Sequence, residues 1–219
     1  MKRLLIVGAG GFGREVFCWA SDIAKLQSQW EIAGFLCDDL HALDSFNYDA
    51  PIVGNIQDYA PKDDEVLVMA IADPGSKLKL ANKFEECGAK FITLIHPTVI
   101  LGKNTTIGRG CVFCPYSSVS CDTTVGNFVT VNTRSGIGHD SHINDGCTLS
   151  SHVDLGGYVE FGTGVFVGSS ANVLPKKKVG DFATIGAGSV VVRSVKPGTT
   201  VFGVPAKTIP SSKDTLQEH

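Results

Sequence analysis

The sequence has no long apolar run and no strong net charge of either sign. These two absences argue against a membrane-spanning protein and against a general nucleic-acid binder. No run approaches the ~18 residues that a membrane-spanning helix needs. The apolar stretch 4–7 ends at Gly8 and is too short to be the apolar core of a signal peptide. A net charge of −3 argues against a general nucleic-acid binder. We therefore expect a cytoplasmic protein with neither membrane nor nucleic acid as a partner.

Cysteine and glycine also lack the spacings that would mark other classes. The seven Cys residues show no disulfide framework, which favours reduced thiols. Cys111-x-x-Cys114 has no second CxxC partner, so we expect no metal, although a carbonic-anhydrase-like zinc site formed by histidines between subunits stays open as an alternative. The 25 Gly residues do not follow collagen's period of three.

The first 95 residues alternate strand and helix signals. Strands are expected at 2–7, 31–37, 65–71 and 90–94, and helices at 14–25 and 75–87. This order predicts a small Rossmann-like α/β domain with a parallel sheet. Residues 1–95 carry a net charge of −5, whereas residues 96–219 carry +2. The charge of the second half therefore favours binding of an anionic ligand there.

From Leu101 onward, an aliphatic or aromatic residue recurs every six positions. The series is Leu101, Ile107, Phe113, Val119, Val125, Val131, Ile137, Ile143, Leu149, Leu155, Phe161, Val167, Val173, Val179, Ile185 and Val191. Small or β-branched residues tend to lie two positions earlier, and Gly often follows directly. This pattern predicts hexapeptide repeats that form a left-handed parallel β-helix.

In such a helix, three hexads make one triangular coil of 18 residues. The aliphatic side chain points inward, and we expect the following Gly to be needed for the backbone angles of the corner. One coil cannot bury its own apolar stack, so about five coils must stack.

Stacking makes residues 18 apart neighbours, which places the chemical groups in columns. His139 lies beneath Gly157, and Asp140 follows it as a carboxylate that could orient the imidazole. His142 and His152 occupy other positions of the coil. The three histidines therefore do not converge on one metal within a chain.

Three motifs carry a resemblance over nearly the full length. They are Gly8-Ala9-Gly10-Gly11-Phe12-Gly13, then Asn132-Thr133 with Ile137-Gly138-His139-Asp140, and finally Val201-Phe202-Gly203-Val204-Pro205-Ala206-Lys207. With them the chain resembles the sialic-acid O-acetyltransferase-type sugar acyltransferases. Within that family it is similar to bacterial N-acetyltransferases that act on nucleotide-linked amino sugars.

The resemblance implies a catalytic site in the β-helix. His139 would be the general base and Asp140 its tuning acid. Acetyl-CoA would lie between the β-helices of a homotrimer, with its thioester oxygen on the Gly157 N–H. Other cofactor-binding positions would be Thr148, Ser169 and Ala187. The lysine run 176–178 could meet the cofactor's phosphates or form a solvated edge.

The glycine turn has three interpretations: a dinucleotide site, a nucleotide-sugar site, or a tight turn with no ligand. Gly8-x-Gly10-x-x-Gly13 fits a dinucleotide fingerprint, but the repeats begin too early for the second half of a dinucleotide fold. The resemblance implies a nucleotide sugar instead. The implied substrate-binding residues are Gly10, Gly11, Phe12, Asp38, Asp39 and Ala72.

We therefore expect two domains, 1–95 for the nucleotide sugar and 96–219 for acetyl-CoA, the latter with a short C-terminal tail. The expected activity is acetyl-CoA-dependent N-acetylation of the sugar amine. The alternatives are O-acetylation of a sugar or sialic acid hydroxyl, and a non-catalytic nucleotide-binding or zinc-dependent hydratase role.

Overall fold

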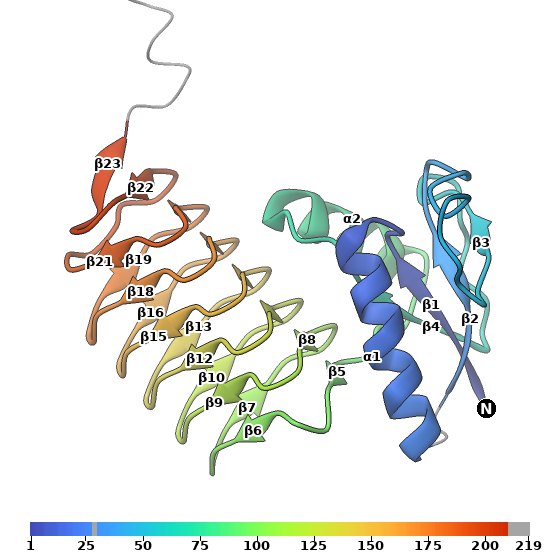
Figure 1. Cartoon of the computed structure of the whole chain (residues 1–219), viewed down its shortest axis with the longest axis horizontal. Helices are drawn as coiled ribbons and strands as arrows, with labels where there is room; N and C mark the ends of the chain where they lie inside the picture. The colour runs from blue at the N-terminus through green and yellow to red at the C-terminus, as the bar shows by residue number, and fades with distance from the viewer. Residues whose placement is uncertain (28–29, 210–219) are drawn as a thin grey trace, which may run out of the picture.

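A computed structural model describes residues 1–27 and 30–209 and shows an α/β unit beside a β-helix (Figure 1). The expected C-terminal tail, 210–219, lies outside the described residues. The α/β unit contains β1 (Lys2–Val7), α1 (Gly11–Gln27), β2 (Trp30–Leu36), β3 (Ile52–Gly54), β4 (Glu65–Met69) and α2 (Pro74–Glu86). Its sheet has the order β3-β2-β1-β4, and every pairing is parallel.

The α/β unit departs from expectation at two places. The expected strand 90–94 is wrong, because Phe91 forms only an isolated bridge with Leu67 and the chain then enters the β-helix. The strand β3 was not expected, because three partly exposed residues after a long loop give no apolar signal. Within the described chain, no helix is long and apolar enough to cross a membrane.

The β-helix presents three flat faces, each a ladder of two- or three-residue strands. Face 1 comprises β5 (Leu94–Ile95), β8 (Val112–Phe113), β11 (Thr130–Val131), β14 (Thr148–Leu149), β17 (Phe166–Val167), β20 (Thr184–Ile185) and β22 (Thr200–Phe202), and β23 (Lys207–Ile209) adds antiparallel to its end. Face 2 comprises β6 (Ile100–Leu101), β9 (Ser118–Val119), β12 (Gly136–Ile137), β15 (Asp154–Leu155), β18 (Asn172–Val173) and β21 (Val190–Val191). Face 3 comprises β7 (Thr106–Ile107), β10 (Thr124–Val125), β13 (His142–Ile143), β16 (Glu160–Phe161) and β19 (Lys178–Val179).

The six-residue period is confirmed. Every member of the aliphatic series ends a strand or lies within one, and all members from Phe113 onward are buried in one continuous core. The small residues two positions earlier tie the coils together. Ser135 Oγ, for example, donates to Ser150 O at 2.6 Å, and Cys147 Sγ donates to Gly162 O at 3.1 Å. The small side chain therefore fills the corner and satisfies a buried carbonyl.

The expected role of the repeat glycines is wrong. Positive φ angles fall on other corner residues, such as Asp140 and Tyr158, and not on the Gly that follows each aliphatic residue. A Cβ on Gly138 would lie 2.5 Å from Gly156 C, and one on Gly168 would lie 2.5 Å from Ala187 N. These glycines are required because the next coil packs directly on them.

The α/β unit packs on face 1, and α2 lies against it (Figure 1). Arg109 forms two hydrogen bonds with the Glu85 carboxylate, at 2.5 and 2.9 Å. Phe91 and Phe128 meet edge to face at 5.0 Å. A Cβ on Gly146 would strike Leu78, so this glycine makes room for the helix. The α/β unit is therefore positioned by face 1, through Lys77, and by the adjoining corner between faces 3 and 1, where Arg109, Phe128 and Gly146 lie.

Candidate active site

His139 and Asp140 occupy the corner between β12 on face 2 and β13 on face 3. His139 Nδ1 lies 2.7 Å from Asp140 Oδ2, and the two side chains are about half exposed. Because a carboxylate only accepts, Nδ1 carries the proton and donates it to Asp140. The Nε2 lone pair is then free to accept a proton from a substrate. Asp140 has a φ of +56°, in the left-handed region that other corner residues of the β-helix also adopt.

Gly157 lies directly against the free nitrogen of His139. A Cβ at this position would be 2.6 Å from Nε2, so only Gly allows the imidazole to settle there. Across residues 1–27 and 30–209, the Gly157 N–H meets no acceptor. The expected stacking of His139 on Gly157 is thus confirmed. A free N–H beside a base is an arrangement that can stabilise a developing oxyanion.

Two more residues border this corner: Tyr158, which the sequence analysis did not consider, and Lys176, which belongs to the lysine run 176–178. The Tyr158 ring meets the imidazole edge to face, with centroids 5.3 Å apart. Lys176 Nζ lies 5.8 Å from the centre of the Tyr158 ring. Both follow Asp140 at steps of 18 residues. The stacking of residues 18 apart therefore predicts that they lie in one column with Asp140.

The other expected cofactor residues lie elsewhere on the β-helix. Ser169 and Ala187 stack at the corner between faces 1 and 2, and Ser169 is exposed there. Thr148 lies on face 1 and is only 3% exposed. Its hydroxyl donates to Ala72 O at 2.7 Å and accepts from Lys77 Nζ at 2.7 Å. Within one chain, these positions and His139 do not form a single site.

The glycine turn separates into structural and open positions. A Cβ on Gly13 would collide with Gly8 O, and Gly8 has a φ of +107°. Gly10 and Gly11 have nothing within 4 Å of an added Cβ. Gly8 and Gly13 thus close the turn, whereas Gly10 and Gly11 leave room for a ligand at the start of α1.

Local hydrogen bonds engage the two expected carboxylates after β2. Asp38 Oδ1 accepts from Ile56 N at 3.1 Å, and Asp39 Oδ1 accepts from His41 N at 2.9 Å. Both residues are exposed, so each retains oxygen lone pairs for a ligand. Gly8 N donates to Leu36 O at 2.8 Å, which brings the glycine turn and the end of β2 to the same sheet edge.

A hollow of about 510 Å³ opens beside the glycine turn. Its lining includes Gly11 and Phe12, which were expected, and Arg14 and Tyr48, which were not. The Arg14 guanidinium lies 3.5 Å from the centre of the Phe46 ring. A cation directly after a glycine turn is a signal for anion binding that the sequence contained.

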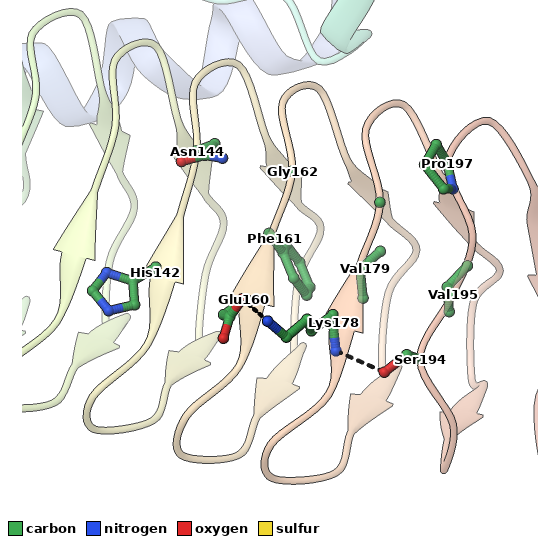
Figure 2. Close-up of a pocket in the computed structure, with 11 residues that line it drawn as sticks. His142, Asn144, Glu160, Phe161, Gly162, Lys178, Val179, Ser194, Val195 and Pro197 are labelled. Carbon is green, nitrogen blue, oxygen red and sulfur yellow. Dashed lines mark hydrogen bonds and ion pairs between the residues drawn. The ribbon is translucent and has the colours of Figure 1, made fainter.

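His142 and His152 do not join His139. Figure 2 shows His142 on face 3, in a shallow hollow of about 450 Å³ where Lys178 pairs with Glu160 at 2.7 Å. His152 lies at the corner between faces 1 and 2. The part of the chain that the structure describes has no group of three residues able to hold a metal ion. Burial raises the pKa of the Cys147 thiol to about 12, which leaves it protonated and unreactive.

Sequence comparisons identify relatives for both parts of the chain. Residues 3–84 match the family model of the PglD N-terminal domain. GDP-perosamine N-acetyltransferase of Escherichia coli O157:H7 is 29% identical over 220 residues, which cover 96% of this chain and 98% of the relative. The match thus extends over both the α/β unit and the β-helix.

Solved structures share the same architecture. The acetyltransferase domain of PglB from Neisseria gonorrhoeae, in complex with acetyl coenzyme A, superposes with a TM-score of 0.85 at 25% identity and covers 95% of this chain and 99% of its own. PerB from Caulobacter crescentus, in complex with CoA and GDP-perosamine, has a TM-score of 0.83 at 25% identity over 96% and 98% of the two chains. Over nearly its full length, the chain is thus similar in sequence and in fold to acetyltransferases of this kind, and its N-terminal part matches the PglD N-terminal domain.

Proposed function

We propose that this chain is an acetyl-CoA-dependent N-acetyltransferase that acts on the amine of a nucleotide-linked amino-deoxy sugar. One observation carries the proposal: the free Nε2 of His139 lies against Gly157, whose N–H has no acceptor in the described chain. Direct transfer of an acyl group to an amine needs a base and an oxyanion donor side by side. The near full-length match to a GDP-perosamine N-acetyltransferase supports the same reaction.

In the proposed reaction, the sugar amine attacks the thioester carbonyl while His139 Nε2 accepts a proton from the nitrogen. Asp140 holds the ring orientation and stabilises the imidazolium that forms. The Gly157 N–H donates to the carbonyl oxygen as its charge grows. An N–C bond forms and the C–S bond breaks. His139 then returns the proton, so that CoA leaves as the thiol.

The two ligands are assigned to different parts of the chain. Residues 96–219 bind acetyl-CoA, and Ser169 and Ala187 contribute along the corner between faces 1 and 2. Residues 1–95 bind the nucleotide sugar at the sheet edge that holds the glycine turn. The substrate contacts are Gly10, Gly11, Phe12, Asp38, Asp39 and Ala72. Arg14 adds a cation for the diphosphate, on the evidence of the hollow that it lines.

The working enzyme is proposed to be a homotrimer. The corner that carries His139 is the edge of the triangular β-helix opposite face 1, and face 1 is where the chain's own α/β unit packs. A sugar bound by that unit therefore lies on the far side from its own His139. A second copy that presents its His139 corner to face 1 completes the site, and a ring of three copies closes the arrangement.

A screen of CoA release tests the function. Purified protein is given acetyl-CoA with GDP-, UDP- or dTDP-linked amino sugars, and each matched hydroxyl sugar serves as the control acceptor. We expect thiol release and an N-acetylated product with an amino sugar only. Turnover of the hydroxyl sugars with no turnover of the amino sugars would establish O-acetylation. Absence of thiol release with every acceptor would refute the acetyltransferase assignment.

A further inference from the structure

Lys77 on α2 is buried against the β-helix and makes three hydrogen bonds to it. The residue is 1% exposed. Its Nζ lies 3.1 Å from Thr130 Oγ1, 3.1 Å from Cys147 O and 2.7 Å from Thr148 Oγ1. An ammonium donates one proton to each of the three oxygens, whereas a neutral amine donates to two of them and accepts the hydroxyl proton of Thr130, so these three partners satisfy the nitrogen in either form.

The same network reaches the edge of the α/β sheet. The Thr148 hydroxyl accepts from Lys77 and donates to Ala72 O at 2.7 Å. Ala72 follows β4 and leads into Asp73, whose carboxylate caps α2 by accepting from Ser76 N at 2.8 Å. A chain of hydrogen bonds thus runs from Lys77 through face 1 to Ala72. It fixes one expected nucleotide-sugar contact relative to the β-helix.

Docking of the α/β unit alone does not call for a buried lysine. Three other contacts already hold the two parts together: Phe91 on Phe128, Leu78 over Gly146, and the Arg109–Glu85 ion pair. Burying an ammonium is costly, and a well-packed apolar residue is often neutral or stabilising in its place. Among the described residues, no carboxylate bonds to Lys77 Nζ. Apolar packing alone leaves the exact position of α2 on face 1 less well defined. The three hydrogen bonds of Lys77 fix that position, because each requires a particular distance and angle.

We propose that Lys77, acting through Thr148, is a positioning residue that sets where Ala72 presents the nucleotide sugar relative to the β-helix. This inference rests on the proposed function, because it assigns Ala72 to the sugar. It also gives Thr148 a role in orienting the sugar-binding edge, in place of the acetyl-CoA contact that the family resemblance implies. Neither side chain touches the reacting atoms.

The test compares Lys77→Met with Lys79→Met, a control on the exposed side of the same helix. We expect Lys77→Met to raise KM for the nucleotide sugar about tenfold, or about 1.4 kcal/mol, and to leave KM for acetyl-CoA within about twofold. Lys79→Met should match the wild type. Thr148→Val, which replaces only the hydroxyl by a methyl group, should reproduce the effect of Lys77→Met and keeps the test decisive if Lys77→Met does not fold.

Three results would overturn the inference. A Lys77→Met or Thr148→Val protein that melts earlier but keeps the wild-type KM for the sugar would have lost only stability. Equal increases in both KM values would show a general disturbance. If no acceptor sugar is turned over, calorimetric binding of GDP, UDP and dTDP supplies the measurement instead. A wild type that binds none of the three would remove the site on which the inference depends, whereas binding without turnover refutes only the acetyltransferase.

Discussion

At the scale of residues, His139 is defined by its neighbours. Asp140 fixes its protonated nitrogen, and Gly157 leaves space for the other. The sequence could predict this arrangement because both contacts follow from adjacency or from the 18-residue repeat. Lys77 could not be predicted in the same way. Its three partners lie 53 to 71 residues away, and no local pattern marks it.

Replacing His139 by Ala should lower kcat by ~10²–10⁴-fold, which is the usual contribution of positioned proton transfer. Acetyl-CoA binding should persist, because the imidazole is not among its proposed contacts. The β-helix should remain folded, because His139 is exposed and leaves no cavity. Steady-state kinetics and circular dichroism measure these outcomes. His142→Ala is the control, and a loss of activity at His142 instead of His139 would mean that the base is misassigned.

Lys77 also gives the stability of the protein a pH dependence. Burial lowers its pKa from 10.5 to about 7, against smaller opposing effects of Cys147, Cys111 and Asp73. Between pH 7 and the unfolded value, the unfolded chain binds more protons than the folded one. The unfolding free energy should therefore rise with pH, by at most about 1.4 kcal/mol per unit for this group.

Denaturant unfolding of the wild type and of Lys77→Met from about pH 7 to 8.5 isolates this contribution. The difference between the two proteins should change with pH in favour of the wild type. Above this range the buried thiols of Cys111 and Cys147, whose pKa values burial raises, contribute the opposite slope. Parallel stability curves for the two proteins would show that Lys77 does not lose a proton on folding.

At the scale of elements, the hexad encodes its own fold because each strand is specified by residues within six positions of it. The strands of the α/β unit are harder to predict from the sequence. The pairing of β3 with β2 depends on a long loop and not on an apolar pattern, and only one residue of 90–94 pairs with β4. The sequence shows the repeat glycines, but the reason that they must be Gly is the close approach of the next coil. A single hexad does not reveal that contact.

Two Gly→Ala substitutions should therefore have opposite effects. Gly168→Ala places a Cβ 2.5 Å from the backbone of the next coil and should destabilise the protein by about 1–3 kcal/mol through overpacking. Gly75→Ala on α2 meets only Asp73 Oδ1 at 3.7 Å and should stabilise by about 0.5–1 kcal/mol through helix propensity. Denaturant midpoints compare the two. A Gly168→Ala protein as stable as the wild type would contradict the stacking explanation.

At the scale of the whole molecule, the proposed function divides the site between opposite sides of one chain. Ala72, at the proposed nucleotide-sugar edge, is bonded to face 1, whereas His139 lies on the edge opposite that face. The sequence predicted both halves but not their separation, because only the packing of α2 on face 1 determines it. We therefore expect sedimentation to give a mass near three times 23.2 kDa at assay concentration. A mass of one chain would contradict the shared site.

Subunit complementation tests the central claim most directly, because it asks whether one copy's His139 serves as the base for a sugar held by another copy. His139→Ala removes the base, and Gly11→Trp fills the open space at the glycine turn, so each variant alone should be inactive. The whole trimer population formed by co-expression at equal levels should recover about a quarter of the wild-type rate, because a quarter of all its sites pair two intact halves at random. Mixed trimers that stay inactive would show that the site lies within a single chain.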